Sequence, residues 1–175
     1  FGLILTQILL KKDIRNVGSK NIGATNVLRT GNKLVAGLTL FLDIFKGAAT
    51  IFLVNEYFPN LIYLSALSAF LGHIFPVWLK FKGGKGVATY VGILCCINIY
   101  LGVSFAVVWF TTFLIFKYSS LSSLIGSLSI PIINFFILKS EVFFFFIIMF
   151  VLIFYTHREN IKRLLNRNES KTKIY

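Results

Sequence analysis

The chain has 175 residues, of which 57% are hydrophobic and 14% are charged, and its formal net charge is +12. A soluble domain of this length carries roughly 25% charged residues, so the composition excludes an ordinary soluble protein. The apolar runs are continuous, which excludes the alternating pattern of a membrane β-barrel. We therefore expect an all-α polytopic membrane protein with a single integral-membrane domain over residues 1–175.

The first half of the chain alternates apolar stretches with polar loops. Residues 1–10 are apolar but too short to span a bilayer, and we expect them to be the inner end of a truncated first membrane helix. A long polar loop follows over residues 11–33. Complete spans are expected at 34–54 and 61–79, because about 20 apolar residues cross a hydrocarbon core of ~30 Å. A second, shorter polar loop covers residues 80–86.

Residues 87–116 form an apolar stretch that is too long for one upright helix and short for two. Gly92, Asn98 and Gly102 are the candidate points at which it could break. The break matters because the number of helices decides which loops share a side of the membrane.

The last part of the chain contains two further expected spans. The first, at 121–138, should be interrupted at Pro131. A tight turn at 139–141 should lead into the second, at 142–156, and a basic tail completes the chain over 157–175.

The distribution of positive charge favours two helices within residues 87–116. The four polar segments then lie on one side and contain 16 of the 18 lysines and arginines; these segments are 11–33, 80–86, 117–120 and 157–175. A single helix would largely remove this asymmetry, and cytoplasmic loops of membrane proteins are enriched in lysine and arginine. We expect about seven transmembrane helices in the intact protein. The net charge is then topogenic and does not indicate nucleic-acid binding.

The first polar loop contains more hydrogen-bond donors than a connection between helices needs. Gly18 and Gly23 permit tight backbone turns, and Arg29 offers a planar group suited to phosphate. The uncharged donors between them are Ser19, Asn21, Thr25 and Asn26. We expect this loop to bind an anionic ligand at the membrane surface; the alternative is a capped loop with a topogenic arginine.

The second polar loop has a glycine-rich sequence directly before an apolar helix. Gly83, Gly84 and Gly86 would let backbone N–H groups approach an anion, and Lys85 adds a full positive charge. The sequence is not a Walker A motif, and the alternative is a flexible basic turn. Upstream, His73 lies within a span, where a residue that hydrogen-bonds between helices is a better interpretation than a catalyst.

Two further polar pairs lie near the ends of the last spans. His157 and Asn160 are three residues apart and share a helix face, and Ser120 and Ser123 have the same spacing at a helix start. Each pair suits a phosphate ligand. The alternatives are a basic helix end whose side chains extend toward water for the first pair and ordinary helix capping for the second.

The remaining polar residues within the spans have structural interpretations. Asp43 and Lys46 are three residues apart and are expected to form an ion pair that supports the site, because intramembrane charges usually pair. Cys95 and Cys96 lack metal-ligand or redox spacing. We expect no metal and no cofactor.

Three motifs in order resemble the bacterial membrane acyltransferases that use acyl phosphate to acylate glycerol 3-phosphate. The match covers nearly the whole chain, and one departure is Lys20, which stands where that family usually has glycine. The first motif is Gly18, Ser19, Asn21, Gly23, Ala24, Thr25, Asn26 and Arg29. The second is Gly72, His73, Phe75, Pro76, Phe81, Gly83, Gly84, Lys85, Gly86, Val87, Ala88 and Thr89. The third is His157, Asn160 and Ile161.

The resemblance implies a glycerol-3-phosphate 1-O-acyltransferase of phospholipid biosynthesis. Its products would be 1-acylglycerol 3-phosphate (lysophosphatidate) and phosphate. It implies a multi-pass protein of the bacterial inner membrane, with the active site on the cytoplasmic side and acyl phosphate supplied by a soluble partner enzyme. The rival function is a transporter of a small phosphorylated metabolite. Two features disfavour it: the polar groups cluster on one face instead of at the midplane, and no inverted repeat is visible.

Combining the residues with the resemblance gives each predicted site residue a role. Arg29, Lys85 and Asn160, with His157, would hold the phosphate of glycerol 3-phosphate, and Asn21, Thr25 and Asn26 would add donors. Ser19 would position the attacking hydroxyl or the donor, and either a substrate phosphate or His157 would be the base. The acyl phosphate would be cradled by Gly83, Gly84, Gly86, Ser120 and Ser123.

Overall fold

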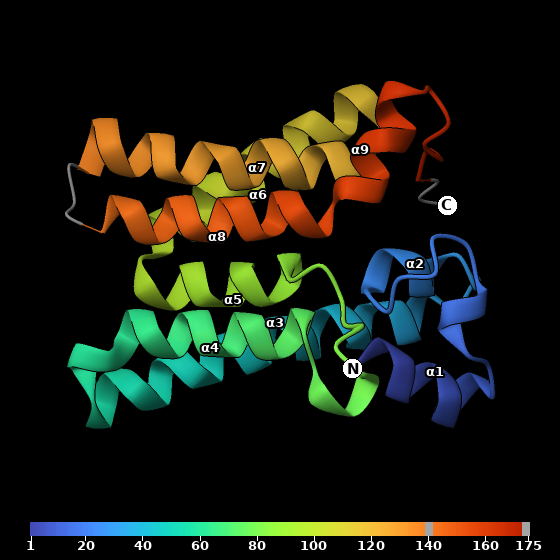
Figure 1. The fold of residues 1–175 in the computed structure, drawn as a ribbon, viewed down its shortest axis with the longest axis horizontal. Helices are drawn as coiled ribbons and strands as arrows, with labels where there is room; N and C mark the ends of the chain where they lie inside the picture. The colour runs from blue at the N-terminus through green and yellow to red at the C-terminus, as the bar shows by residue number, and fades with distance from the viewer. Residues whose placement is uncertain (139–141, 173–175) are drawn as a thin grey trace. The chain divides into compact units, whose positions relative to one another are not determined.

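The computed structural model describes residues 1–138 and 142–172, and these consist of helices and connecting loops with no strand among them. The turn expected at 139–141 lies outside the described residues. The chain divides into two compact units, Phe1–Cys96 and Ile97–Tyr175 (Figure 1). The single domain expected over residues 1–175 stays a prediction.

The first unit is built around a long apolar helix, α3, that confirms the first expected complete span. Its start is capped by the Asn32 side chain, which accepts a hydrogen bond from the Val35 N–H at 2.9 Å. Figure 1 shows α3, α4 and α5 running alongside one another. The helices of this unit are α1 (Gly2–Leu10), α2 (Ala24–Leu28), α3 (Lys33–Tyr57), α4 (Ile62–Ile74) and α5 (Val87–Ile97), with 3₁₀ turns at η1 (Ile14–Asn16), η2 (Pro59–Leu61) and η3 (Val77–Leu79).

Helices α3 and α5 approach each other through two glycines. Gly92 of α5 lies directly against the backbone carbonyl of Ile44, and Gly47 of α3 lies against the carbonyl of Thr89. A Cβ atom at either glycine would overlap the opposite backbone. Small residues at helix crossings allow this close approach in membrane proteins, so these two positions fix how α5 is seated on α3.

The first polar loop folds over a small apolar core at one end of α3. Its buried members come from α1, from the loop itself, from α2 and from α3, so burial of apolar side chains anchors a segment that is rich in polar ones. The core residues are Leu3, Ile14, Ile22, Val27, Val35 and Ala36.

The second unit contains three apolar helices followed by a short charged one, and α7 packs against both α6 and α8. Asn98 caps α6 by accepting a hydrogen bond from the Tyr100 N–H at 2.9 Å. The expected break in residues 87–116 is therefore confirmed at Asn98, and it leaves helices of 11 and 18 residues. The suggested breaks at Gly92 and Gly102 are wrong, because both residues lie inside helices. The elements are α6 (Ile99–Phe116), α7 (Ser119–Ile133), η4 (Asn134–Leu138), α8 (Phe143–Thr156) and α9 (Arg158–Leu165).

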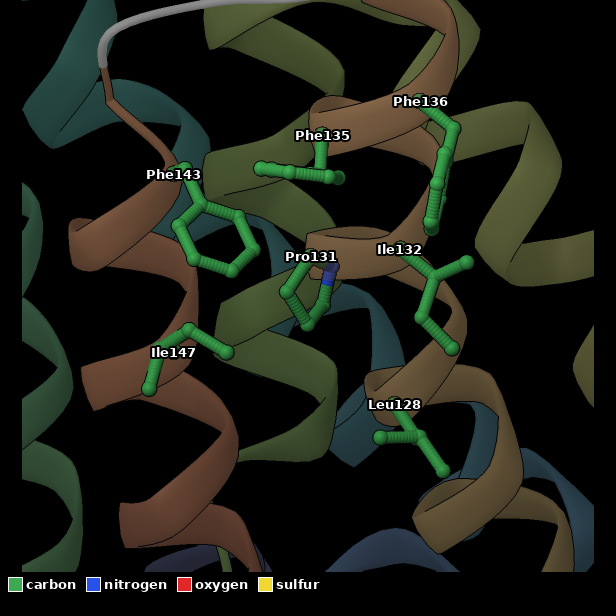
Figure 2. Close-up of a pocket in the computed structure, with 7 residues that line it drawn as sticks. All are labelled: Leu128, Pro131, Ile132, Phe135, Phe136, Phe143 and Ile147. Atoms are coloured by element: carbon green, nitrogen blue, oxygen red, sulfur yellow. The ribbon is translucent and has the colours of Figure 1, made fainter.

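Helix α7 continues through Pro131, so the expected interruption at that residue is wrong. The helix instead changes to the π-helical segment η4 directly after α7, and π-helical turns are rare. An apolar pocket of about 250 Å³ lies beside this segment, between α7 and α8 (Figure 2). Its lining residues are Leu128, Pro131, Ile132, Phe135, Phe136, Phe143 and Ile147.

Four helical segments within the described residues are long and apolar enough to cross a membrane. A fifth is reached if α8 and α9, which meet at a bend of 63°, count as one span. The all-α membrane fold is thus confirmed, whereas the number seven stays a prediction. The four segments are Lys33–Tyr57, Pro59–Leu79, Ile99–Phe116 and Ser119–Ile137.

Candidate functional site

Asn26 is the hub of the first polar loop. Its side chain is buried, and its Oδ1 accepts a hydrogen bond from the Ser19 N–H at 2.9 Å. Its Nδ2 donates to three backbone carbonyls, those of Ile14, Val17 and Asn21, at 3.2, 2.9 and 2.8 Å. The amide that we expected to face a ligand therefore shapes the loop in this structure, because a buried amide is stable only when its polar atoms are paired.

Gly18 makes room for the side chain of Arg29. Its φ is +50°, and a Cβ atom there would lie 2.7 Å from Arg29 Cδ and 3.0 Å from Arg29 Nη1. A residue with a side chain would be strained by the left-handed backbone at this position, and its Cβ atom would overlap the alkyl part of the Arg29 side chain. Gly18 thus leaves the space that the Arg29 side chain occupies, and Arg29 itself directly follows α2 as its C-cap.

The other predicted residues of this loop lie at its surface. Ser19 and Asn21 are half-buried, and Thr25 is exposed in the first turn of α2. Lys20, next to Ser19, is exposed and has a φ of +59°. The departure from the family's glycine therefore leaves a left-handed backbone in place, a conformation that glycine adopts without cost.

Replacement of Lys20 by glycine is expected to stabilise the protein. The left-handed conformation costs a non-glycine residue about 1–2 kcal/mol, and the greater chain entropy of glycine offsets part of this gain. We expect a net gain of about 0.5–1 kcal/mol, measured by thermal unfolding in detergent. Lys12→Gly is the control, since Lys12 is exposed without a positive φ and should gain nothing. A lower midpoint for Lys20→Gly than for Lys12→Gly would contradict the argument.

The glycine-rich loop is held against the end of α4. The Gly83 N–H donates to the Ile74 carbonyl at 3.1 Å, and the Gly84 N–H donates to the His73 carbonyl at 3.2 Å. The end of α4 thus accepts from both N–H groups in this structure, and the expectation that Gly83 and Gly84 cradle an anion stays a prediction. Gly86 has a φ of +83°, and its carbonyl accepts the Tyr90 N–H in the first turn of α5 at 2.8 Å. Lys85, which lies between Gly84 and Gly86 in the sequence, is half-buried.

The expected ion pair of α3 is confirmed and has a third member. Lys46 Nζ lies 2.5 Å from Asp43 Oδ1, and the same ammonium contacts His73 Nδ1 of α4. His73 therefore bonds between helices, as expected. Its link to Lys46 was not predicted, because nothing in the local sequence relates residues 27 positions apart.

In the second unit, three donors converge on the carboxylate of Glu169. Ser120 Oγ and Asn160 Nδ2 donate to Glu169 Oε1 at 2.9 and 2.7 Å, and Arg163 Nε donates to Oε2 at 2.6 Å. Two of these donors, Ser120 and Asn160, were predicted to bind or act on substrate. In this structure they hold an anion that belongs to the chain itself.

Glu169 was missed by the sequence analysis, although it is an acidic residue in a basic tail. Burial by itself raises the pKa of Glu169, and the hydrogen bonds from Arg163, Asn160 and Ser120 lower it by more. The pKa of this carboxyl therefore lies below its ordinary value of 4.5. Glu169 connects the start of α7 to α9, so its charge stabilises the arrangement of these helices.

Glu169→Gln is expected to lower the free energy of unfolding by about 2 kcal/mol at pH 7, since it weakens hydrogen bonds to a charged group. Because the pKa of Glu169 is lower in the folded state, wild type keeps this stabilisation above pH 4.5 and loses it as pH falls through the folded pKa. Thermal unfolding at pH 7 and at acid pH measures both effects. Glu159→Gln is the control, because its side chain is 63% exposed. Equal midpoints for the two variants would contradict the role of Glu169.

His157 occupies the bend between α8 and α9 and is buried. Its Nδ1 lies 2.8 Å from the Ile153 carbonyl, which can only accept, so Nδ1 carries the proton and the neutral ring has its lone pair on Nε2.

Ser123 donates its hydroxyl to the Ser119 carbonyl at 2.9 Å and accepts from Trp109 Nε1 at 3.1 Å. The predicted phosphate contact of Ser123 therefore has no support in the geometry, since the helix backbone takes its proton.

These polar residues lie near the ends of apolar helices, and within the described residues four helical segments are long and apolar enough to cross a membrane, so the fold is that of an integral membrane protein. The family model for glycerol-3-phosphate acyltransferase matches residues 1–167. The chain therefore belongs to the glycerol-3-phosphate acyltransferase family, as the motifs indicated.

Individual relatives agree with this assignment. The chain is 63% identical over 175 residues to the glycerol-3-phosphate acyltransferase of Pelagibacter ubique, covering all of this chain and 91% of the relative. It is 46% identical over 171 residues to that of Mesorhizobium japonicum, covering 98% and 88%. The crystal structure of PlsY (YgiH), an integral membrane glycerol 3-phosphate acyltransferase, in its glycerol 3-phosphate form is similar with a TM-score of 0.89 at 36% identity, over 98% of this chain and 88% of that one.

Proposed function

We propose that this chain transfers a fatty acyl group from acyl phosphate to the 1-hydroxyl of sn-glycerol 3-phosphate. The observation that carries the proposal is the family match over residues 1–167, which includes every polar residue discussed above except Glu169. The similar crystal structures are a glycerol 3-phosphate form and a lysophosphatidic acid form of that relative. Glycerol 3-phosphate is a substrate of the proposed reaction, and lysophosphatidic acid is its product.

The cations of the first unit suit the phosphate of glycerol 3-phosphate. Gly18 leaves room for the Arg29 side chain, and Lys85 lies two residues before the start of α5, where helical N–H groups add partial positive charge. We assign the substrate phosphate to these two residues, with Asn21 and Thr25 as neighbouring donors and Asn26 as the residue that shapes their loop. Ser19 is assigned to positioning the reacting groups.

The residues of the second unit are assigned to the same reaction. His157 has its lone pair on Nε2, which suits a general base, and a phosphate oxygen of the substrate is the rival base. Asn160 and Ser120 donate hydrogen bonds to the Glu169 carboxylate. We assign Asn160 and Ser120 to the catalytic part of this unit, and Glu169 to positioning them. Gly86 and Ser123 remain candidates for binding the acyl phosphate. Ser123 is the weaker candidate, because its hydroxyl already bonds the Ser119 carbonyl and Trp109.

Acyl phosphate is the donor that this set of residues suits. The hydroxyl oxygen attacks the acyl carbon, the bond from that carbon to the phosphate oxygen breaks, and the hydroxyl proton passes to the base. The products are 1-acylglycerol 3-phosphate and inorganic phosphate. Because phosphate leaves readily, orientation and stabilisation of negative charge supply most of the rate enhancement. No covalent intermediate on the protein is needed.

The acyl tail belongs among the apolar helix surfaces. The pocket between α7 and α8 is lined by seven apolar residues and has a volume of about 250 Å³ (Figure 2). We propose it as one place where hydrocarbon chains contact this protein. The bacterial inner membrane, a cytoplasmic active site and a soluble enzyme that supplies acyl phosphate complete the proposal.

A donor comparison tests the proposed function. The purified chain in detergent is given glycerol 3-phosphate with palmitoyl phosphate, palmitoyl-CoA or palmitoyl-acyl carrier protein in separate reactions. We expect lysophosphatidate only with palmitoyl phosphate, and one inorganic phosphate released per product. Equal or faster reaction with palmitoyl-CoA would overturn the assignment of the donor.

A further inference from the structure

Three polar side chains inside the helices of the first unit have no part in the reaction as described so far. Asp43 and Lys46 lie on α3, and His73 lies on α4. Asp43 and His73 are only 2% and 9% exposed. Polar residues within membrane-spanning helices are costly and usually serve the function of the protein. We therefore expect this network to support a functional part of the fold.

The network fixes the orientation of the His73 ring. The Lys46 ammonium can only donate, so His73 Nδ1, which it contacts, must accept and the ring proton is on Nε2. Lys46 is in turn held by Asp43 at 2.5 Å, and Asp43 Oδ1 lies 3.7 Å from His73 Nδ1. The carboxylate therefore balances the charge of the lysine, and the lysine holds one edge of the imidazole in place.

The opposite edge of the ring lies against the glycine-rich loop. A Cβ atom at Gly84 would overlap His73 Nε2 and lie 2.8 Å from Cε1. The backbone of the same histidine accepts the Gly84 N–H at 3.2 Å, and the adjacent Ile74 carbonyl accepts the Gly83 N–H at 3.1 Å. Both the side chain and the backbone at His73 thus set where the loop runs.

We propose that His73 is a positioning residue that places Lys85 for the phosphate of glycerol 3-phosphate. Lys85 is the next residue after Gly84, so a displaced loop carries its ammonium away from the substrate. The inference rests on the proposed function, and it adds the α3–α4 network as the support of the binding loop.

His73→Asn tests this support with little change in polarity. The asparagine Oδ1 can still accept from Lys46, but the ring edge beside Gly84 is removed. With palmitoyl phosphate as the donor, we expect the KM for glycerol 3-phosphate to rise at least tenfold and kcat to change less than threefold. Thr39→Val in α3 is the control, because Thr39 is also buried and its hydroxyl donates to its own helix, at the Val35 carbonyl. It should leave both constants unchanged.

Gly84→Ala disturbs the same contact from the side of the loop, because the new methyl group would overlap the His73 ring. It should produce the same rise in KM for glycerol 3-phosphate. In the double variant with His73→Asn, the shorter side chain leaves room for the new methyl group. The KM of the double variant should therefore be lower than the product of the two single effects predicts. If His73→Asn fails to fold, Gly84→Ala alone decides whether KM rises.

The outcomes separate this inference from the proposed function. A wild-type chain that does not acylate glycerol 3-phosphate from palmitoyl phosphate overturns the proposed function. An active wild type, with folded variants whose KM for glycerol 3-phosphate is unchanged or whose effects simply multiply, overturns the positioning role of His73.

Discussion

Replacing Lys85 by alanine should reduce kcat/KM for glycerol 3-phosphate by a factor of about 30 to 1,000. Truncating one partner of a hydrogen-bonded charge pair in a binding site costs about 2–4 kcal/mol, and each 1.4 kcal/mol is about tenfold. The effect should appear mainly as a higher KM, because the ammonium binds a phosphate that does not itself react. Steady-state kinetics with palmitoyl phosphate at saturation measure it.

Lys82→Ala is the matched control for this variant. Lys82 lies three residues earlier in the same loop and is exposed, whereas Lys85 is half-buried. We expect Lys82→Ala to change kcat/KM less than threefold, since an exposed charge contributes little through screened interactions. If the two variants behave alike, the loop acts only through its general charge and Lys85 has no specific site.

Replacing Gly92 by alanine should lower the free energy of unfolding by about 3 kcal/mol or more. The new methyl group would overlap the Ile44 carbonyl and lie 3.0 Å from the Ala48 nitrogen, and both are backbone atoms of α3. Backbone cannot rotate away as a side chain can, so α5 must move off α3, and overpacking of this kind costs about 1–3 kcal/mol or more. Thermal unfolding and the yield of monodisperse protein in detergent report the change.

Gly37→Ala provides the opposite expectation within α3. A Cβ atom at Gly37 meets nothing within 4 Å, and alanine is favoured over glycine in a helix by about 1 kcal/mol. This variant should be as stable as wild type or slightly more stable. A similar loss of stability in both variants would show that the crossing of α3 and α5 is not the cause.

The helices could largely be predicted from the sequence, because hydropathy and local capping are properties of neighbouring residues. The expected span at 34–54 is the core of α3, which covers Lys33–Tyr57, and the break at Asn98 follows from a side chain that caps its own helix. The Asp43–Lys46 pair is also local, since a helix places residues three apart on one face. Pro131 did not break the helix, because α7 continues through it to Ile133.

The partners of the predicted site residues could not be found in this way. Asn26 bonds to Ile14, Gly84 bonds to His73, and Ser120 bonds to Glu169 across 49 residues. These contacts depend on the path of the backbone, and residue type alone does not tell a donor that binds a ligand from one that binds the chain. The sequence therefore could not separate residues that contact a ligand from residues that support the loop, and the ligand contacts stay a prediction.

The most direct test of the central claim is to place the protein in sealed vesicles with labelled glycerol 3-phosphate outside and palmitoyl phosphate in the membrane. We predict labelled lysophosphatidate in the bilayer, an equal amount of released phosphate, and no labelled glycerol 3-phosphate in the lumen. Label that accumulates in the lumen without any acylated product would contradict the acyltransferase and favour a transporter.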